Sequence, residues 1–228
     1  MPVTSPVSDR LTVAGLLLLT FGTGIIDAIS VLVLGHVFVA NMTGNVIFLG
    51  FWFARQSVVD MTAAVVAFGS FLGGAVIGGR FARHLQHDTR RWVTAALSVE
   101  CVLLVTLSIL AGAGILDYQD NTKLILIAGL AVAFGSQNAT ARQFGIQELS
   151  TTVLTSTIVG IGVDSRLAGG TGQREKLRYS VVLTMCLGAV VGATLSRFMV
   201  APVIALVAAL VAATAILFWF GPPAPADD

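Results

Sequence analysis

Long apolar stretches separated by short polar segments dominate the chain. A helix that crosses a membrane needs about 20 predominantly apolar residues, and six of the stretches meet or approach that length. They are 11–34, 61–81, 92–116, 124–140, 179–200 and 201–220. The pattern predicts an all-α integral membrane protein, with residues 1–228 forming a single polytopic domain.

Two further apolar stretches are unsuited to a full crossing. Residues 151–163 would cover only about 20 Å as a helix, against a hydrocarbon core about 30 Å thick. Residues 37–54 are long enough, but Asn41, Thr43 and Asn45 crowd their first half. We expect both stretches to be short re-entrant half-helices, and eight short crossings are the alternative.

Charge supports six crossings. Lys and Arg collect in the segments 80–91 and 166–178, whereas residues 117–120 are acidic. Cytoplasmic loops are rich in Lys and Arg, so both basic segments are expected on the cytoplasmic side. Six crossings and two half-helices place them there, together with both termini. Eight crossings would put the two basic segments on opposite sides.

An internal repeat with a period of about 112 to 114 residues relates the two halves, 11–116 and 121–220. The matching pieces are Phe21-Gly22 with Phe134-Gly135, 42–47 with 154–159, Gly50 with Gly162, and Gly74 and Gly78 with Gly188 and Gly192. Each half would hold three crossings and one half-helix. An odd number of crossings makes the halves run oppositely through the membrane, as in inverted-repeat transporters.

Composition excludes several classes of protein. Only 11% of residues are charged, against about 25% in soluble domains, and the net charge of +1 argues against a nucleic-acid partner. Cys101 and Cys186 lie in apolar stretches and are expected to be core residues. No phosphate-binding loop, zinc motif or nucleophile elbow occurs, so we expect no metal, no cofactor and no enzymatic activity. The Pro-rich, acidic tail 221–228 is expected to be disordered.

The polar segment 41–45 is the first candidate site. Its side chains are expected to cap the first half-helix, and Gly44 allows a close approach of backbone or solute. The amino terminus of a helix inside a membrane attracts anions and dipoles. Thr155 and Thr157 take the equivalent place in the second half. The alternative is that these groups only cap and pack their own helices.

Four more polar residues are expected at membrane depth: Asp27, Glu100, Gln137 and Asn138. A carboxylate there costs at least about 2.5 kcal/mol, so Asp27 and Glu100 should face the interior of the bundle. Asp27 is interpreted either as a proton carrier, cation ligand or solute contact, or as an acceptor of hydrogen bonds from the neighbouring half-helix. The amides of Gln137 and Asn138 both donate and accept.

Two glycine pairs, Gly74 with Gly78 and Gly188 with Gly192, predict close helix contacts. The contact could lie within the chain or join two copies in a homo-oligomer. The sequence leaves both possibilities open.

The most distinctive stretches are 24–27, 38–45, 137–139 and 151–155, and above all Asn41-Met42-Thr43-Gly44-Asn45. In them the chain resembles the YoaK family of bacterial membrane proteins, also called DUF1275 or UPF0700. The resemblance covers nearly the whole chain and implies six crossings in the bacterial cytoplasmic membrane. It implies no substrate. The family's second half usually carries Thr-Gly where this chain has Thr155-Ser156.

Together these features predict a membrane transporter or channel for a small solute or ion, with the lipid bilayer as its other partner. The pathway would run between the ends of the half-helices, lined by Asp27, Asn41, Thr43, Asn45, Gln137 and Asn138 with Thr155 and Thr157 opposite, and Asp27 would couple protons or cations. The alternative is a membrane scaffold or sensor without transport, in which the buried polar groups only hold the bundle together.

Overall fold

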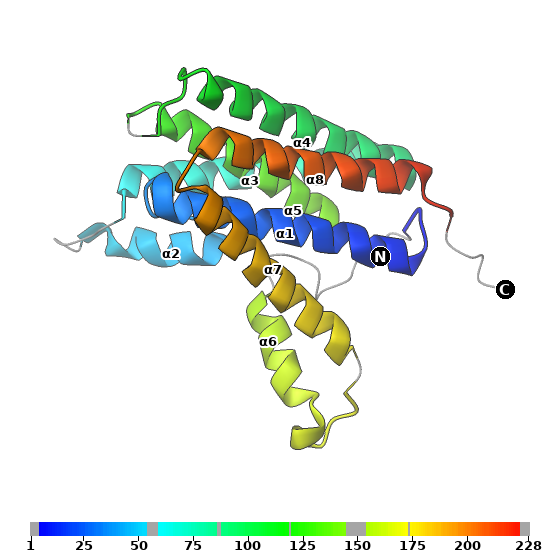
Figure 1. The fold of residues 1–228 in the computed structure, drawn as a ribbon. Helices are drawn as coiled ribbons and strands as arrows, with labels where there is room; N and C mark the ends of the chain where they lie inside the picture. Colours follow the sequence, from blue (N-terminus) through cyan, green and yellow to red (C-terminus); the bar gives the residue numbers. More distant parts are fainter. Residues whose placement is uncertain are drawn as a thin grey trace.

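The protein is a bundle of helices in its computed structural model (Figure 1). The structure describes residues 5–53, 59–85, 88–118, 120–144, 154–172 and 174–223, and these contain no strand. The helices are α1 (Asp9–Val33), α2 (Met42–Gly50), α3 (Met61–His84), α4 (Thr89–Gly112), α5 (Lys123–Arg142), α6 (Leu154–Val163), α7 (Glu175–Leu195) and α8 (Val200–Phe220). The predicted tail lies mostly outside the described residues.

Six of these helices, α1, α3, α4, α5, α7 and α8, are long and apolar enough to cross a membrane, which confirms the predicted all-α fold and its six long elements. The other two are short. α2 has 9 residues and α6 has 10, so each covers about 15 Å, half the thickness of the hydrocarbon core. Neither is long enough for the seventh and eighth crossings of the alternative topology.

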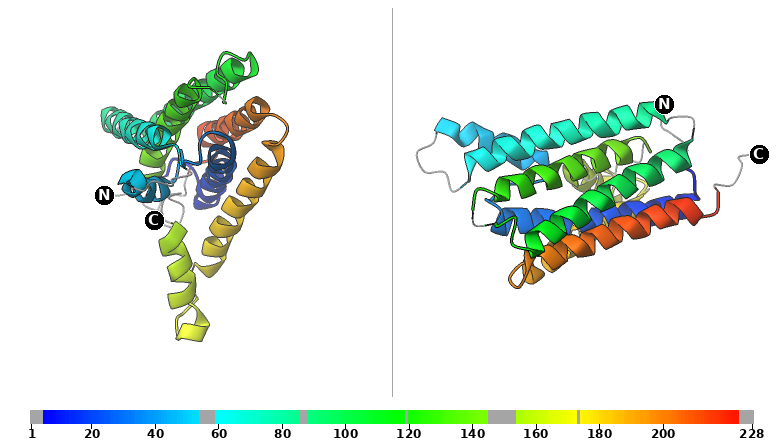
Figure 2. Two further views of the ribbon diagram at one scale, coloured as in Figure 1. Left: turned by 90° about the vertical axis from the view of Figure 1, so that its left-hand side faces the viewer. Right: turned by 90° about the horizontal axis from the view of Figure 1, so that it is seen from above.

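The long helices associate in pairs that link the two halves of the chain. The most extensive interfaces are α3 with α5, α4 with α8, and α1 with α7. α1 also packs on α8, and α5 on α4, while α2 packs on α3 and α6 on α7. The right panel of Figure 2 shows the long helices side by side, and Figure 1 shows α6 and the start of α7 standing apart from the others.

Glycines set the closest contacts between paired helices. In α7, Gly188 and Gly192 lie against the backbone of Phe21 and Ile25 in α1. The same arrangement recurs in the other pair, where Gly74 and Gly78 of α3 lie against the backbone of Val132 and Ser136 in α5. All four glycines are buried. They therefore pack against neighbouring helices within the chain.

The register of these contacts fixes the helix directions. α7 runs parallel to α1, and α3 parallel to α5, because the residue numbers rise together along each pair. α8 is antiparallel to α4, since Cys101 donates to the Ala208 carbonyl and Ser108 to the Ala201 carbonyl. Gly15 and Gly22 of α1 meet Phe218 and Val207, so α8 is antiparallel to α1 as well. α1, α4 and α7 thus run one way, and α3, α5 and α8 the other.

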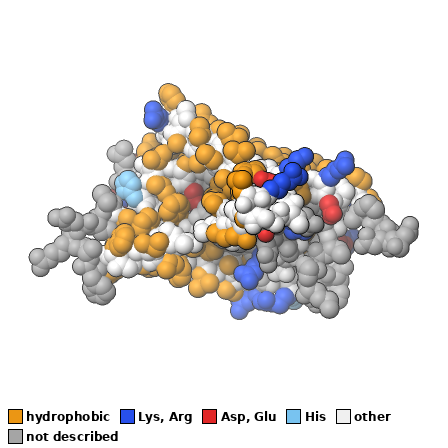
Figure 3. Space-filling model, turned by 90° about the horizontal axis from the view of Figure 1, so that it is seen from below, with side chains coloured by type: hydrophobic (Ala, Val, Ile, Leu, Met, Phe, Trp, Pro, Cys, Tyr) orange, Lys and Arg blue, Asp and Glu red, His pale blue; other side chains and the backbone are white. Residues whose placement is uncertain are grey.

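Arg90 joins three segments at one end of the bundle. Its guanidinium donates to the carbonyl oxygens of Trp219 (2.7 Å), Pro6 (2.9 Å) and Gly221 (2.9 Å). The two ends of the described chain and the basic segment 80–91 therefore share this end. Figure 3 shows that most Lys and Arg side chains on one face lie toward it, with hydrophobic side chains over much of the remainder.

At the opposite end, Asp60 links α3 to α5. It accepts from the Ala63 backbone N–H at 3.1 Å and pairs with the Lys123 ammonium at 2.9 Å. The backbone N–H of Asp60 also donates to the Gly35 carbonyl (3.3 Å). The chain from Gly35 to Asp60, which contains α2, therefore leaves this end of the bundle and rejoins it at the same end.

We expect Gly188→Ala to destabilise the fold, because a methyl group there would overlap the Phe21 carbonyl oxygen. Overpacking of this kind costs about 1–3 kcal/mol. Thermal unfolding in detergent measures the loss. Gly69→Ala is the matched control, since nothing lies within 4 Å of a methyl group at that position. Equal melting temperatures for the two variants would contradict the close contact.

A second prediction concerns acid stability. Partial burial opposes ionisation of Asp60, but the hydrogen bond and charge of Lys123 and the Ala63 N–H outweigh it and lower the pKa of Asp60. A lowered folded-state pKa stabilises the fold above the unfolded-state pKa, and this stabilisation disappears as the pH falls through the folded-state value. Asp60→Asn should therefore lose less stability on acidification than the native protein. Lys123→Gln should have the same effect. If the stability of both variants depends on pH as that of the native protein does, the ion pair of Asp60 with Lys123 does not stabilise the fold.

Candidate functional site

Helical structure is interrupted between α1 and α2, over residues 34–41, and this non-helical segment is called the break below. Gly35 (φ 126°) and His36 (φ 60°) have left-handed backbone conformations that turn the chain back toward the bundle. Val37, Val39 and Ala40 are then fully buried. Backbone N–H and C=O groups within a membrane need partners inside the protein or in a water-filled cavity. The backbone groups of this buried segment therefore need partners within the protein.

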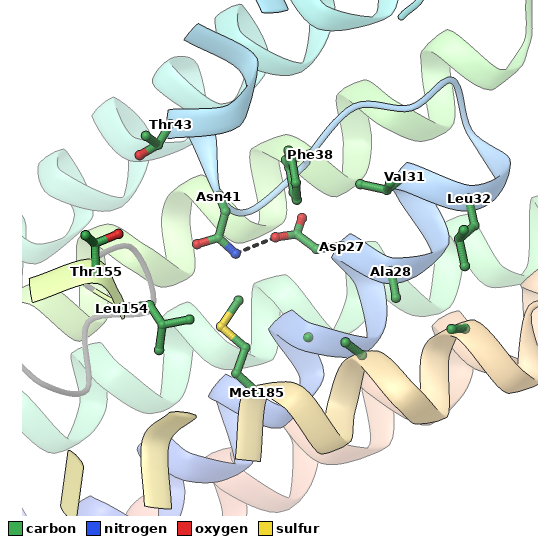
Figure 4. A pocket seen from close by; sticks show the side chains of 13 residues that line it. Asp27, Ala28, Val31, Leu32, Phe38, Asn41, Thr43, Leu154, Thr155 and Met185 are labelled. Carbon is green, nitrogen blue, oxygen red and sulfur yellow. Dashed lines mark hydrogen bonds between the residues drawn. The ribbon is translucent and has the colours of Figure 1, made fainter. Parts of the chain in front are cut away.

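Asp27 supplies most of those partners. One carboxylate oxygen accepts from the backbone N–H groups of Val39 (3.0 Å) and Ala40 (2.9 Å), and the other accepts from the side-chain amide of Asn41 (Figure 4). The Asp27 side chain is buried in α1, with 5% of its surface exposed. These bonds correspond to the structural interpretation of Asp27, in which it holds the break.

Asn45 holds the same break from the other side. Its amide oxygen accepts from the Phe38 N–H at 2.9 Å, and its amide nitrogen donates to the Phe38 carbonyl at 2.6 Å. The capping predicted for Asn41 is wrong in its detail. Asn41 precedes α2, but its side chain makes no capping bond and donates to Asp27 instead. Gly44 packs against the Phe38 ring.

The second half offers a related arrangement around α6. Thr157 is the one buried residue of α6, as Asn45 is of α2. Arg178 of α7 fixes the end of α6, since it donates to the Gly160 carbonyl (2.8 Å) and pairs with Asp164. The segment before α6, residues 145–153, lies outside the described residues.

An open cavity of about 510 Å³ lies between α1, α2, α6 and α7. The first turns of both short helices reach it, through Thr43 of α2 and Thr155 of α6 (Figure 4). Its lining residues are Gly24, Asp27, Ala28, Val31, Leu32, Phe38, Asn41, Thr43, Leu154, Thr155, Met185, Ala189 and Ala193.

The lining is mainly apolar and carries few polar groups. Thr43 and Thr155 contribute hydroxyls, and Asn41 contributes the amide oxygen that Asp27 does not use. The Asp27 carboxylate reaches the cavity with three donors already bound. Such a surface suits a small molecule that is largely apolar and forms one or two hydrogen bonds.

The predicted site residues thus fall into three groups. Asp27, Asn41, Thr43 and Thr155 meet at the cavity. Gly44 and Asn45 of α2 contact Phe38, which lines the cavity, and Thr157 is buried in α6.

The third group lies elsewhere in the bundle. Gln137 donates to the Thr23 hydroxyl (3.4 Å), Asn138 donates to the Phe134 carbonyl (2.9 Å), and Glu100 is buried in α4. None of these three is among the residues that line the cavity.

Several lining residues were missed, notably Phe38, Met185 and Ala189. They are apolar residues in apolar stretches, which the sequence cannot distinguish from core or lipid-facing positions. Within the described ranges, no group of three or more His, Cys, Asp or Glu side chains could hold a metal ion.

Asn45→Ala should destabilise the protein because the N–H and C=O of Phe38 would both lose a buried partner. A buried polar group left unsatisfied costs about 1–3 kcal/mol. The melting temperature in detergent tests this, with the exposed Asn121→Ala as the control. A wild-type melting temperature for Asn45→Ala would show that the break is held in some other way.

Comparison with known proteins agrees with the fold. Residues 15–217 match the family model described as "Protein of unknown function (DUF1275)". The chain is similar to the UPF0700 transmembrane protein YoaK of Bacillus subtilis (strain 168), with 31% identity over 193 residues, or 80% of this chain and 82% of the relative. No solved structure matches the chain. The six apolar helices, the break held by Asp27 and this match together establish that the chain is a multi-pass membrane protein of the DUF1275 family.

Proposed function

We propose that the protein is a transporter or channel for a small solute, which binds in the cavity between α2 and α6. One observation carries the proposal: the first turns of both short helices line the same cavity. In several transporter folds, interrupted helices end at the solute site near the middle of the bilayer, where their termini offer unpaired backbone groups. α2 begins without a side-chain cap, so its first N–H groups remain available to a ligand.

The proposal includes an inverted repeat that relates α1–α4 to α5–α8. The helix interfaces support it. If each helix is replaced by its counterpart in the other half, the interface of α1 with α7 becomes that of α5 with α3, α1 with α8 becomes α5 with α4, and α2 with α3 becomes α6 with α7. All of these interfaces are present in the structure. The directions also support it, since α1 opposes α5, α3 opposes α7, and α4 opposes α8. Both short helices would then be re-entrant, each entering from its own side.

The close contacts refine the alignment of the halves. Gly24 meets Met185 and Ala189 as Gly135 meets Phe71 and Ala75. Gly24 is therefore the counterpart of Gly135, and the sequence match of Gly22 with Gly135 was displaced by two residues; Gly22 packs on α8 instead. The refined register pairs Asp27 with Asn138. Near it, Asn45 corresponds to Thr157 and Thr43 to Thr155.

The lining defines the class of solute. Thr43, Thr155 and the Asn41 oxygen offer hydrogen bonds within apolar walls, and the one carboxylate is occupied by protein donors. We therefore propose a small, uncharged or weakly polar solute. Thr43 and Thr155 would bind its hydrogen-bonding group from the two halves.

The rival function is a membrane scaffold or sensor without transport. The hydrogen bonds of Asp27 favour it, since they hold the fold and engage both carboxylate oxygens with donors from the protein itself. The two functions differ in their response to ligands. A transporter is stabilised by its solute through mass action, whereas a scaffold responds to none.

A thermal-stability screen of purified protein against metabolites and ions tests the proposal. We expect at least one small, weakly polar compound to raise the melting temperature. Thr43→Val and Thr155→Val should each weaken that response by about two- to tenfold in apparent affinity, since a lost hydrogen bond costs about 0.5–1.5 kcal/mol. Thr106→Val is the matched control, because Thr106 lies on the exposed face of α4 and bonds only within its own helix.

Uptake of the stabilising compound into proteoliposomes then separates transport from binding alone. A stabilising ligand that both valine variants bind as the native protein does would place the site elsewhere. A broad screen without any stabilising compound would favour the scaffold.

A further inference from the structure

Glu100 of α4 is buried without a hydrogen-bond partner for one of its carboxyl oxygens. Its side chain has 3% of its surface exposed, and Oε1 makes no hydrogen bond. It lies on the buried stripe of α4 that also holds Leu97, Leu104 and Leu107. An ionised carboxyl group among such neighbours is costly unless a donor or cation compensates it.

The packing of α4 on α5 places Glu100 opposite a second polar residue. Leu107 of α4 lies over Gly129 of α5, and the two helices follow each other in opposite directions. Because α4 and α5 are antiparallel, moving seven residues back from Leu107 and seven residues forward from Gly129 covers the same distance in the same direction along the bundle. These steps reach Glu100 in α4 and Ser136 in α5. Glu100 therefore lies at the level of Gln137, whose side chain is also buried, with 3% exposed.

A second route around the bundle gives the same level. Cys101, next to Glu100, donates to the Ala208 carbonyl of α8. The neighbouring Val207 packs on Gly22 of α1. Gly22 precedes Thr23, the residue to which Gln137 donates. Both routes thus put Glu100, Thr23 and Gln137 in one layer of the interior.

The Gln137 amide has an unsatisfied acceptor of its own. Its nitrogen donates to Thr23, but Oε1 is buried and has no partner. Two unsatisfied acceptors, Glu100 Oε1 and Gln137 Oε1, therefore occupy the same layer. A single proton on Glu100 would remove its charge and supply an O–H donor in the layer that holds the Gln137 oxygen.

We propose that Glu100 and Gln137 form a proton-binding site in the centre of the bundle, separate from the solute cavity. The carboxylate takes a proton from water to become a neutral carboxyl group, and returns it to water on release. Thr140 lies one turn beyond Gln137 on α5, toward the end that carries Arg90, and its hydroxyl is also buried without a partner. Its hydroxyl provides a hydrogen-bonding group between the Glu100 site and the end of the bundle that carries Arg90.

The charged groups on the surrounding helices leave this role to Glu100. α8 has no titratable residue, α5 carries Lys123 and Arg142 only at its ends, and the titratable groups of α3 (Arg80, Arg83 and His84) lie in its last turns. The Cys101 thiol is occupied by Ala208, and Asp27, one turn beyond Thr23, by its three donors. We therefore place proton coupling at Glu100, whereas the sequence pattern placed it at Asp27. This coupling role rests on the proposed transport function, whereas proton binding does not.

Infrared difference spectroscopy of the purified protein tests the site without any solute. We expect the native protein to show the carbonyl stretch of a protonated carboxyl group in a hydrophobic environment, with the shift that exchange into deuterated water produces. Glu100→Gln should abolish this band, and Asp27→Asn should retain it. Gln137→Leu should keep the band at a higher frequency, because the carboxyl group loses its hydrogen-bond acceptor.

The outcomes are distinguishable. A native spectrum without the band, or a band that disappears in Asp27→Asn and persists in Glu100→Gln, would overturn the site. An unshifted band in Gln137→Leu would remove Gln137 from it, and this variant also serves if Glu100→Gln fails to fold. The full pattern of bands in a protein that transports nothing would leave the proton site standing and reject the transport function.

Discussion

The fold depends on hydrogen bonds between a buried carboxylate and the backbone N–H groups of a non-helical segment inside the bundle. Lipid offers no hydrogen bonds, so a chain that leaves helical geometry at membrane depth needs donors and acceptors from the protein itself. Asp27 accepts from two consecutive backbone N–H groups and from Asn41, and Asn45 satisfies both backbone groups of Phe38. These bonds hold the segment that precedes α2 inside the bundle, and the first turn of α2 then lines the cavity.

The close glycine contacts add a second constraint. Gly188 and Gly192 bring α7 against α1, while Gly74 and Gly78 bring α3 against α5. Each short helix packs on one of these pairs, α6 on α7 and α2 on α3. The two interfaces therefore carry the two short helices toward a common cavity. Membrane helices associate through such close backbone packing because lipid provides no hydrophobic driving force between them.

Much of the fold was predictable from the sequence, for a physical reason. Hydrocarbon thickness sets the length of a crossing, so six long apolar stretches predicted six long helices, and the short stretch at 151–163 predicted a short one. Asp27 was predicted to face the interior, and its alternative as an acceptor for the neighbouring half-helix matches its bonds. An unpaired carboxylate in lipid costs so much free energy that a single Asp in an apolar stretch is enough to predict a partner for it inside the bundle.

The remaining features depend on contacts between distant segments. The apolar walls of the cavity, such as Met185 and Ala189, carry no signal that separates them from core. In the proposed repeat the counterpart of Gly135 is Gly24 and not Gly22, and only the contacts of α7 with α1 indicate this. Glu100 and Gln137 were expected inside the bundle, but only the register of α4, α5 and α8 places them in one layer. Asp27 and Glu100 both lie in apolar stretches, but Asp27 accepts three hydrogen bonds whereas Glu100 Oε1 accepts none.

Side-specific cysteine labelling tests the central claim most directly: that α2 and α6 enter from opposite faces of the membrane. In a protein with Cys101 and Cys186 replaced, Trp52→Cys reports the far end of α2, and Leu167→Cys reports the turn after α6; both positions are exposed. A membrane-impermeant reagent added to intact cells should label Trp52→Cys, and should label Leu167→Cys only after the membrane is opened. Labelling of both positions from outside would contradict the opposed arrangement of the two short helices.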